Sequence, residues 1–407
     1  MSDNINLSME QQNALEMCCD LTMPIVSVTG GAGTGKTLVL GKVYEELKRL
    51  RKTIVLCAPT GRAAKRIEEL TKIRAKTVHR MLEFPLPNDP DADGNVDPNE
   101  PRRSKDFPLE EDVIIVDESS MISPALYRFI LNAMKRGSVI RWFGDNNQLP
   151  PVEEGKPPFI TLLKEHPAIT LTYNFRSGDA LIENGQRILR GSLPRRNPRF
   201  EIIYSDFPLD ALLDFITVEF TTENYQIITP TRKGRTGTIR SNPSIQMKFN
   251  SRGKMLRLDR FDKEESPLAI REKDKFIWIK NDYKLDLFNG ELGYVDWIDP
   301  DIGDLGIVTG ERAVVIPSRV KTYNSYIGTV INYDPRKQLE LGYAVTTHKA
   351  QGSEFKTIIY YISRSQAWLL NRRNFYTAIT RARENVILIT DRKAMNLAMR
   401  RYEDTLR

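Results

Sequence analysis

One segment near the N-terminus limits the possible folds of this chain more than any other, and it reads Gly30-Gly31-Ala32-Gly33-Thr34-Gly35-Lys36-Thr37. It fits the pattern G-x-x-x-x-G-K-[ST] and follows a short apolar run from Ile25 to Val28. In this pattern the glycines let successive backbone N–H groups surround a phosphate, the lysine reaches the outer phosphate oxygens, and the last hydroxyl can ligate Mg²⁺. We therefore predict a strand, a phosphate-binding loop and a helix from Leu38 to Leu50.

The composition is that of a globular chain. A length of 407 residues and a hydrophobic content of 40% predict two or three domains with ordinary cores. No apolar run approaches the roughly 20 residues that a bilayer span needs, and the polar start from Met1 to Asn6 lacks a signal pattern, so we expect a cytoplasmic protein with no membrane partner. Cys18, Cys19 and Cys57 have neither a disulfide nor a zinc spacing and should be reduced. A formal charge of +7 permits nucleic-acid binding without requiring it.

A second apolar run, from Val113 to Val116, leads into the acidic pair Asp117 and Glu118. Behind a phosphate-binding loop, such a pair suits hydrolysis of a nucleoside triphosphate. Asp117 would hold Mg²⁺ and Glu118 would polarise the attacking water, because phosphoryl transfer needs a positioned nucleophile and neutralised charge. A solvated helix start is the alternative reading of the pair.

The rest of the chain repeats the alternation of buried strand and helix without a second phosphate-binding loop. Strands are expected from Ile140 to Phe143, Tyr225 to Thr229, Lys356 to Ile362 and Asn385 to Thr390, with helices from Asp179 to Leu189 and Arg372 to Arg383. This pattern predicts an α/β protein with two lobes that face each other across one nucleotide. We expect residues 1–82 and 109–178 to form lobe one, and residues 179–251 and 341–407 to form lobe two.

Two segments interrupt the α/β pattern. Residues 83–108 contain six prolines, too many for a helix or a central strand, so this segment should project from lobe one. Residues 252–340 contain short β-like runs, from Phe276 to Lys280, Gly293 to Ile298 and Ala313 to Pro317, separated by turns such as Phe288-Asn289-Gly290. They predict a small β-barrel inserted into lobe two.

Eight short motifs occur along the chain in a characteristic order. They are Leu7 to Gln11, Ala58 to Ala64, Thr77 to Arg80, Gly144 to Val152, Tyr173 to Arg176, Thr229 to Gly234, Val345 to Phe355 and Tyr376 to Arg383. Together with the phosphate-binding loop and Asp117-Glu118, they resemble the motifs of superfamily 1 DNA helicases of the RecD-like type. The resemblance covers nearly the whole chain, and its compact layout is similar to that of phage-encoded helicases of this type.

The resemblance implies a fold and an activity. The fold would have two RecA-like P-loop ATPase lobes, a β-hairpin-like pin inserted in lobe one and a small SH3-like β-barrel inserted in lobe two. The activity would be ATP- and Mg²⁺-dependent movement along single-stranded DNA, in the 5′ to 3′ direction, with unwinding of forked duplex DNA. The barrel is further supported by Asn281-Asp282-Tyr283 and by Asn289 to Gly293, which resemble the barrel signature of this type.

The resemblance also implies residues that act on the nucleotide. Gln11 would bind adenine, Lys36 and the rest of its loop would hold the phosphates, and Gln148 would sense the γ-phosphate. Arg176 and Arg381 would reach the γ-phosphate, while Thr37 and Asp117 would hold the metal. The expected nucleotide-binding set also includes Gln351, Gly352 and Glu354. Arg176 and Arg381 could instead be solvated cations at helix ends.

Residues of both lobes would contact the DNA strand. This set comprises Pro59, Thr60, Gly61, Arg62 and His79 in lobe one, and Thr346, Thr347, His348 and Lys349 in lobe two. Short polar side chains and adjacent N–H groups are suited to gripping phosphates, and lobes that grip alternately would advance along one strand. His79 and His348 could equally be structural histidines.

The projecting segment has an acidic tip, from Asp89 to Glu100, that fits a twelve-position calcium loop. It lacks flanking helices and is flanked by prolines, so a solvated acidic turn is the favoured reading and calcium binding the alternative. Phe84 and Phe107 lie nearer the base of the projection.

The sequence leaves other readings of the function open. The chain could be a translocase that does not unwind duplexes, or a nucleic-acid-binding switch driven by ATP turnover. RNA is a weaker substrate candidate, because nothing specifies recognition of the 2′-hydroxyl. We expect a protein that functions as a monomer, with replication or recombination proteins as further possible partners.

Overall fold

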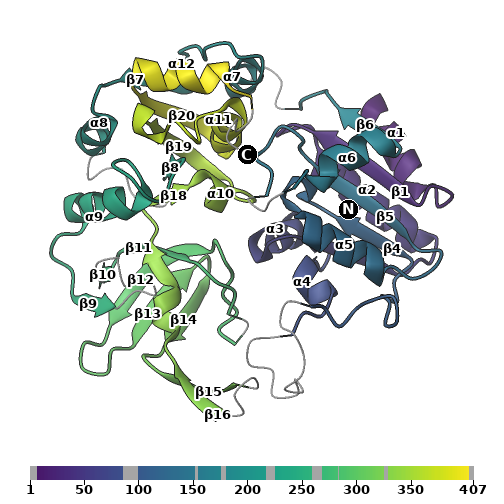
Figure 1. Ribbon diagram of the computed structural model, residues 1–407, viewed down its shortest axis with the longest axis horizontal. Coiled ribbons are helices and arrows are strands. Elements are labelled where there is room, and N and C mark those ends of the chain that lie inside the picture. The colour runs from purple at the N-terminus through teal and green to yellow at the C-terminus, as the bar shows by residue number, and fades with distance from the viewer. Residues whose placement is uncertain are drawn as a thin grey trace. The chain divides into compact units, whose positions relative to one another are not determined.

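The computed structural model describes residues 7–85, 100–151, 155–175, 180–216, 225–258, 268–282, 284–324 and 329–402. By their contacts, the described residues fall into two compact units. Unit 1 contains the described residues up to 175, and unit 2 contains those from 180 to 402. Each unit is built around its own parallel β-sheet (Figure 1).

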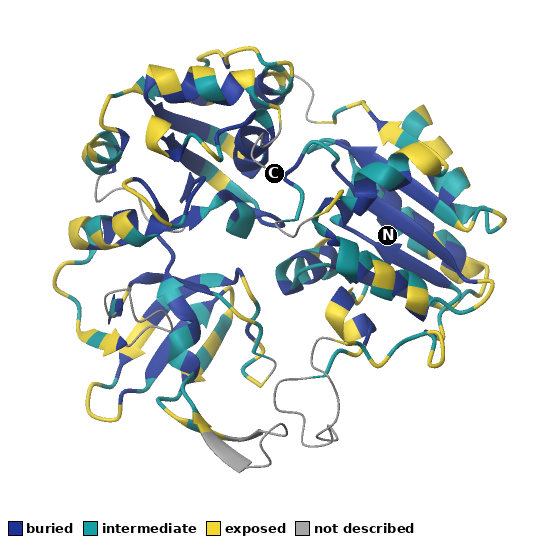
Figure 2. Cartoon of the chain, in the orientation of Figure 1, coloured by how far each residue is buried: buried dark blue, intermediate teal, exposed yellow. Residues whose placement is uncertain are grey.

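Unit 1 has a six-stranded sheet with the order β3-β2-β4-β5-β1-β6, in which every pair is parallel. Its strands are β1 (Ile25–Gly30), β2 (Ile54–Ala58), β3 (Lys76–Thr77), β4 (Val113–Val116), β5 (Val139–Gly144) and β6 (Ala168–Leu171). Its helices are α1 (Met9–Cys19), α2 (Lys36–Arg49), α3 (Gly61–Thr71), α4 (Val78–Met81), α5 (Pro124–Ala133) and α6 (Pro158–Glu165). The central strands are buried along almost their whole length, as parallel strands covered on both faces should be (Figure 2).

The strand register of unit 1 aligns the carboxyl ends of its central strands. Thr29 of β1 is paired with Gly144 of β5, and Val116 of β4 is paired with both Trp142 of β5 and Cys57 of β2. The loops that follow β1, β2, β4 and β5 therefore leave from one edge of the sheet. In open parallel sheets this is the edge at which ligands bind.

Unit 2 has a five-stranded parallel sheet with the order β18-β8-β19-β20-β7. Its strands are β7 (Phe200–Tyr204), β8 (Tyr225–Thr229), β18 (Ala344–Thr346), β19 (Phe355–Ile362) and β20 (Ala382–Thr390). Its helices are α7 (Ala180–Leu189), α8 (Pro208–Phe215), α9 (Thr238–Phe249), α10 (Thr347–Ala350), α11 (Arg372–Ile379) and α12 (Arg392–Arg400). The helix expected from Arg372 to Arg383 is thus shorter than predicted, because Ala382 already begins β20.

An antiparallel β region lies between α9 and β18 in the sequence of unit 2. Strands β11 (Lys275–Trp278), β12 (Leu292–Ile298), β13 (Leu305–Thr309), β14 (Arg312–Ile316) and β17 (Leu339–Leu341) form a sheet with the order β14-β13-β12-β11-β17. Two further pairs join β9 (Met255–Leu258) to β10 (Leu268–Arg271) and β15 (Val320–Asn324) to β16 (Thr329–Tyr333). Strands β14 and β17 lie at the two edges of the five-stranded sheet.

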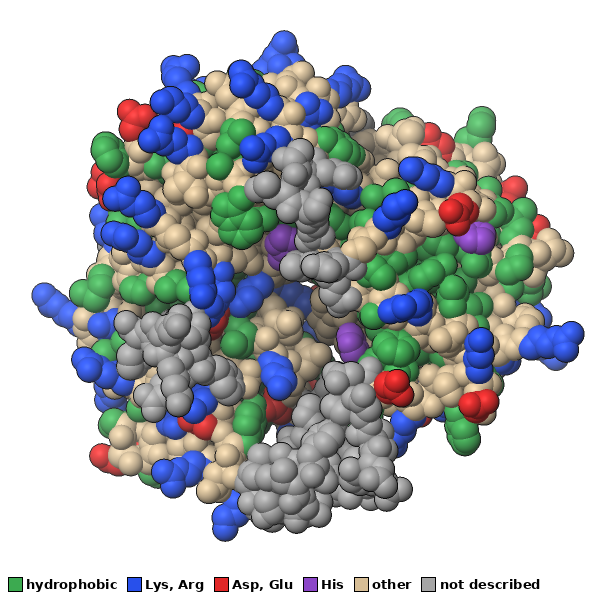
Figure 3. Space-filling model, viewed as in Figure 1, with side chains coloured by type: hydrophobic (Ala, Val, Ile, Leu, Met, Phe, Trp, Pro, Cys, Tyr) green, Lys and Arg blue, Asp and Glu red, His purple; other side chains and the backbone are tan. Residues whose placement is uncertain are grey.

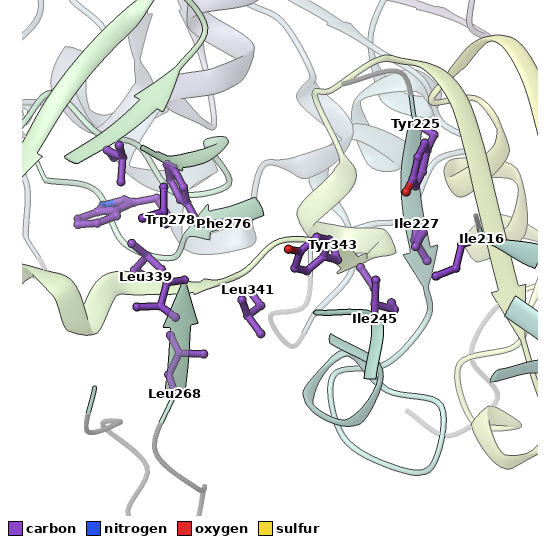
Figure 4. Close-up of a cluster of buried hydrophobic side chains, with 14 of the residues drawn as sticks. Ile216, Tyr225, Ile227, Ile245, Leu268, Phe276, Trp278, Leu339, Leu341 and Tyr343 are labelled. Carbon is purple, nitrogen blue, oxygen red and sulfur yellow. The ribbon is translucent and has the colours of Figure 1, made fainter. Parts of the chain in front are cut away.

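The β region and the parallel sheet of unit 2 share one hydrophobic core. Phe276, Trp278 and Leu341 of the β region belong to the same buried cluster as Ile227 of β8 and Ile245 of α9. Figure 4 shows Tyr343 between these two groups of side chains. Continuous apolar packing of this kind fixes the β region relative to the helices and strands of its own unit.

The base of the predicted projection in unit 1 is closed by backbone hydrogen bonds. The N–H of Arg103 donates to the carbonyl oxygen of Leu82 at 3.1 Å, and the N–H of Arg102 donates to that of Glu83 at 3.3 Å. Phe84 packs against Phe129 in the hydrophobic core of unit 1, so its ring is part of the lobe. The acidic segment at 89–99 lies outside the described residues.

A buried arginine attaches α1 to the sheet of unit 1. The guanidinium of Arg141, on β5, donates hydrogen bonds to the carbonyl oxygens of Cys18, Asp20 and Met23 at and after the end of α1. Burial lowers the pKa of Arg141 from its ordinary value, and the exposed carbonyls at a helix C-terminus compensate its charge. The three cysteines are free thiols. Within the described ranges, no helix is long and apolar enough to span a bilayer.

Candidate nucleotide and strand-contacting sites

The glycine-rich loop follows β1 and leads into α2, as predicted. Gly35 has φ +81°, and a Cβ atom there would lie 2.3 Å from Nε2 of Gln11, so only glycine fits. The ammonium of Lys36 donates hydrogen bonds to the carbonyl oxygens of Gly30 at 2.7 Å and Gly31 at 2.9 Å. The Lys36 side chain therefore contacts the backbone of the phosphate-binding loop to which it belongs.

Gln11 is almost fully buried and connects α1 to this loop. Its Oε1 accepts a hydrogen bond from the N–H of Ser8, which completes a capping box at the start of α1. Its Nε2 donates to the carbonyl oxygen of Thr34 at 3.1 Å. The residue expected to bind adenine thus also fixes the helix to the phosphate-binding loop.

Asp117 and Glu118 follow β4 at the same edge of the sheet. Burial raises the pKa of Asp117, as does the neighbouring Glu118 charge, while the Glu118 N–H and the cations Lys36 and Arg66 act in the opposite direction. Glu118 has φ +50°, which is unusual for a residue with a side chain. Asp117 is buried, so it is not a solvated residue at a helix start, whereas Glu118 is partly exposed and is the N-cap of the short helix at Ser119–Met121.

The segment after β5 is bound to the end of β1. Asn146 and Thr29 exchange hydrogen bonds of 3.3 Å, and Thr29 immediately precedes the glycine-rich loop. Nε2 of Gln148 donates to the carboxylate of Asp145 at 3.4 Å, and both side chains are buried. The structure therefore brings Lys36, Asp117 and Gln148 to one edge of a single sheet.

The segment after β6 is held from two sides. The carboxylate of Glu10 accepts hydrogen bonds from the N–H groups of Thr172 at 2.7 Å and Tyr173 at 3.0 Å, and from the Thr172 hydroxyl. Nδ2 of Asn174 donates to the carbonyl oxygen of Ala32 at 2.7 Å, and the N–H of Phe175 donates to that of Gly33 at 3.1 Å. Arg176 is the next residue and lies outside the described ranges.

The strand-contacting residues of unit 1 begin two helices. Thr60 is the N-cap of α3, and its hydroxyl accepts a hydrogen bond from the N–H of Ala63 at 3.2 Å. Pro59 and Arg62 are partly exposed, whereas Gly61 is buried. His79 is exposed on α4, and its ring centroid lies 4.9 Å from that of Phe84.

The corresponding residues of unit 2 have a similar arrangement. Thr346 ends β18 and caps α10, and its register partner Thr229 ends β8. Thr347 is fully buried and donates a hydrogen bond to Asn374 at 2.8 Å, so its hydroxyl supports the helix. His348 and Lys349 are partly exposed on α10.

Glu340 joins two of the motifs in unit 2. Its carboxylate pairs with Arg232 at 3.0 Å and with Lys349 at 3.1 Å. Burial by itself raises the pKa of Glu340, but the charges of Lys349 and Arg232 outweigh burial and hold this pKa below its ordinary value. One ionised carboxylate therefore fixes a cation from each motif.

The nucleotide-binding residues expected in unit 2 lie near the starts of β19 and β20. The N–H of Phe355 donates to the carbonyl oxygen of Arg381 at 2.8 Å, and Glu354 pairs with Arg383 at 3.1 Å. The Arg381 side chain is 3% exposed and donates to the carbonyl oxygen of Thr377 at 3.2 Å, so it is not a solvated helix-end cation. Gln351 and Gly352 are buried, and Gly352 has φ +72°.

Four supporting residues were not identified from the sequence, namely Glu10, Asn174, Glu340 and Asn374. Glu10 lies inside a motif, but the motif does not indicate its contacts more than 160 residues away in the chain. Among the described residues, no group of three or more His, Cys, Asp or Glu side chains could hold a metal ion. The residues expected to ligate Mg²⁺, Thr37 and Asp117, form a smaller set, which suits a metal that is also held by phosphates.

Comparisons with known proteins agree with this arrangement. Residues 11–154 match the family model of an AAA domain, and residues 341–389 match that of the UvrD-like helicase C-terminal domain. The ATP-dependent RecD2 DNA helicase of Deinococcus radiodurans is 30% identical over 98% of this chain and 51% of that protein. The RecD subunit of the RecBCD enzyme of Haemophilus influenzae is 25% identical over 93% of this chain and 68% of that protein. The chain thus spans about half the length of the RecD2 relative.

Solved structures with the same fold include two of Pif1 helicases. Pif1 from Bacteroides, in complex with ADP-AlF3 and single-stranded DNA, has a TM-score of 0.62 and 21% identity, and the match covers 96% of this chain and 94% of that one. Pif1 from Candida albicans has a TM-score of 0.60 and 20% identity, with 97% of both chains covered. The fold is that of proteins with two RecA-like α/β units. The RecD and RecD2 sequence relatives agree with the resemblance to superfamily 1 helicases of the RecD-like type.

Proposed function

We propose that this protein is an ATP-dependent DNA helicase that moves along single-stranded DNA, from 5′ to 3′, and unwinds duplex DNA. The observation that carries the proposal is the edge of the unit 1 sheet, where the Lys36 loop, the Asp117-Glu118 pair and Gln148 follow three aligned strands. Phosphate binding, activation of water and sensing of the γ-phosphate need these residue types at one place. The names of the relatives and the motif order agree with this activity.

The nucleotide chemistry would involve residues of both units. Lys36 and the loop N–H groups would hold the phosphates, and Thr37 and Asp117 would hold Mg²⁺, which supplies positive charge to the phosphates. The buried carboxyl of Asp117, which the charges of Lys36 and Arg66 influence, is chemically suited to this role. Glu118 would orient the attacking water. Arg381 would stabilise the transition state, so that hydrolysis requires both units to close on one nucleotide.

Each unit would have one site that binds the DNA strand, and alternate binding at these two sites would convert the closing of the units into movement along the DNA. In each unit a threonine at or just after the carboxyl end of a strand caps the next helix, Thr60 in unit 1 and Thr346 in unit 2. Lys349 adds a cation beside the second of these sites. Lys and Arg side chains are also prominent on the face of unit 2 that Figure 3 shows, which favours a polyanionic ligand. The direction of movement is taken from the family resemblance alone.

Strand separation would depend on the segment at residues 83–108. Opening one base step costs about 1.4 kcal/mol, so a wedge can hold a fork open while movement supplies repeated work. Phe84 is packed in unit 1, so the wedge would use other residues of this segment. We propose that the β region of unit 2 is an SH3-like barrel, and that the acidic segment binds no calcium. We also propose that the protein acts as a cytoplasmic monomer.

The decisive experiment compares duplexes that carry a 5′ tail or a 3′ tail. Unwinding of the 5′-tailed duplex in the presence of ATP and Mg²⁺ would support the proposal, and unwinding of only the 3′-tailed duplex would overturn the direction. ATP hydrolysis that is stimulated by single strands without any unwinding would identify a translocase. Unstimulated hydrolysis would favour a binding switch. Affinity for single strands should also fall with salt, with a logarithmic slope near −0.7 per phosphate contact.

A further inference from the structure

A buried hydrogen bond joins α10 and α11, the two helices of unit 2 that carry motif residues. The hydroxyl of Thr347, the first residue of α10, donates to Oδ1 of Asn374 on α11 at 2.8 Å. The phenol of Tyr360, on β19, donates to the same oxygen at 3.0 Å. Thr347 and Asn374 are completely buried, so solvent does not compete for these bonds. Asn374 therefore ties the helix expected to grip the DNA strand to the helix that precedes Arg381.

The position of Asn374 on α11 gives this bond its significance. Asn374 lies near the start of α11, and Arg381 lies just beyond its end. The five residue steps from Asn374 to the end of α11 at Ile379 span roughly 8 Å, so Asn374 and Arg381 are placed at opposite ends of one short helix. Arg381 is itself bound to this helix through the carbonyl oxygen of Thr377. A shift of α10 would thus be transmitted to the position of the arginine.

The cost of placing an asparagine here also argues for a specific role. Nδ2 of Asn374 is buried and has no hydrogen-bond partner in the part of the chain that is described. An unsatisfied buried N–H group costs about 1–3 kcal/mol, which a small apolar residue would avoid. The benefit of Asn374 must therefore come from its Oδ1, which accepts both hydroxyl hydrogens.

We propose that Asn374 is a positioning residue that couples the strand grip on α10 to Arg381, so that strand binding accelerates ATP hydrolysis. This inference rests on the proposed function, in which Arg381 acts on the γ-phosphate. Asn374 touches neither ATP nor DNA in this scheme. Substitution of Asn374 should therefore reduce the increase in the ATP hydrolysis rate that DNA causes, and leave the rate without DNA unchanged.

The test measures ATP hydrolysis of the full chain with and without saturating single-stranded DNA. For Asn374→Ala, we expect the rate without DNA to stay within about twofold of the parent rate, and the DNA-stimulated rate to fall about tenfold, the effect of losing one buried hydrogen bond. The affinity for a fluorescent single strand should stay nearly constant. A merely structural role would instead lower both rates together.

Tyr360→Phe is the matched control, because it removes a bond of similar length to the same oxygen but leaves the bond between Thr347 and Asn374 in place. We expect it to retain the stimulation of the parent. If Tyr360→Phe loses as much stimulation as Asn374→Ala, or if Asn374→Ala is stimulated normally, the coupling proposal is wrong. If the parent itself is not stimulated by DNA, the proposed function fails, and the coupling proposal fails with it.

A second pair of variants keeps the test valid if Asn374→Ala does not fold. Thr347→Val removes the hydroxyl donor and keeps the side-chain volume, whereas Thr347→Ser keeps the donor. We expect Thr347→Val to lose the stimulation and Thr347→Ser to retain most of it. Equal stimulation of these two variants would overturn the proposal.

Discussion

The carboxylate of Glu10, in the first turn of α1, accepts a hydrogen bond of 3.0 Å from the N–H of Tyr173, three residues before Arg176. The side-chain bond to Thr172 lowers the pKa of Glu10, as do its backbone bonds to Tyr173 and Thr172, while the slight burial opposes them. Glu10 is therefore ionised at neutral pH and holds the segment that leads to the arginine.

We expect Glu10→Ala to lower the maximal rate of ATP hydrolysis by roughly tenfold, because the charge-assisted bonds that position this segment are lost. Steady-state kinetics would measure the change, with a smaller effect on KM than on kcat. Glu16→Ala is the matched control, since Glu16 lies on the same helix and its carboxylate accepts a hydrogen bond from the nearby Gln12 side chain. Similar kinetics for the two variants would show that this anchor is unimportant.

Lys36→Ala should abolish ATP hydrolysis, because Lys36 supplies the charge that neutralises the transferred phosphate. Binding of single-stranded DNA should be largely unchanged, since Thr60 and Thr346 follow other strands. Phosphate release and fluorescence anisotropy would measure the two effects. Lys42→Ala, which removes an exposed lysine of the same helix, should behave as the parent. Hydrolysis by Lys36→Ala at the parent rate would exclude the proposed nucleotide site.

Most of the α/β core could be predicted from the sequence, because buried parallel strands read as apolar runs. The runs from Val113 to Val116 and from Tyr225 to Thr229 were predicted with their observed limits. Strands such as β3 and β18 were missed, because two or three residues carry too little pattern to recognise.

The motif residues could also be predicted, but their supporting contacts could not. Local spacing identifies Lys36 and Asp117, whereas the partners of Glu340 are set by how strands far apart in the sequence pack together. The same limit applies to Asn374, whose partner Thr347 lies 27 residues earlier in the chain. Such pairs depend on tertiary structure and leave no periodic signal.

Arg381→Ala should reduce the DNA-stimulated rate of hydrolysis by a factor of about 10³ or more, the range typical of arginines that stabilise a phosphoryl-transfer transition state. Affinity for a non-hydrolysable ATP analogue should change far less, because this interaction forms mainly in the transition state. Arg392→Ala, at an arginine that stacks on Tyr204, is the control and should leave both quantities unchanged. A stimulated rate equal to that of the parent would remove Arg381 from the mechanism.

Glu340→Gln should destabilise the protein at pH 7 by roughly 1–3 kcal/mol, because Arg232 and Lys349 lose their common partner. The pKa of Glu340 is lower in the folded protein than its ordinary value of about 4.3. Its stabilisation is therefore fully present above that value and is lost as the pH falls through the folded pKa. Urea unfolding of parent and variant should thus show a difference at pH 7 that shrinks below about pH 4.

Glu384→Gln is the control for this pH dependence, because Glu384 forms an exposed pair with Lys356 at 3.8 Å. Exposed pairs contribute little, so this variant should unfold like the parent at both pH values. A stability difference for Glu340→Gln that stays constant between pH 7 and pH 3.5 would mean that the ionised carboxylate is not its cause.

Shortening the projecting segment should separate unwinding from hydrolysis. Residues 86–99 can be replaced by about four Gly and Ser residues, because the backbone bonds of Leu82 and Glu83 to Arg103 and Arg102 already bring the two ends together. Closing a shorter loop at this base costs little, since the entropy of closure varies only logarithmically with length. Phe84 is kept because it packs against Phe129 in the core of unit 1.

We expect this variant to hydrolyse ATP at the parent rate with single-stranded DNA and to lose most of its unwinding of tailed duplexes. The ion pair of Glu83 with Arg103, at 2.7 Å, remains and should preserve the base. A variant with fourteen Gly and Ser residues in place of 86–99 keeps the length but not the side chains, so its unwinding distinguishes a role of the side chains from a role of loop length. Unwinding by the shortened variant as fast as by the parent would show that strands are separated elsewhere on the protein.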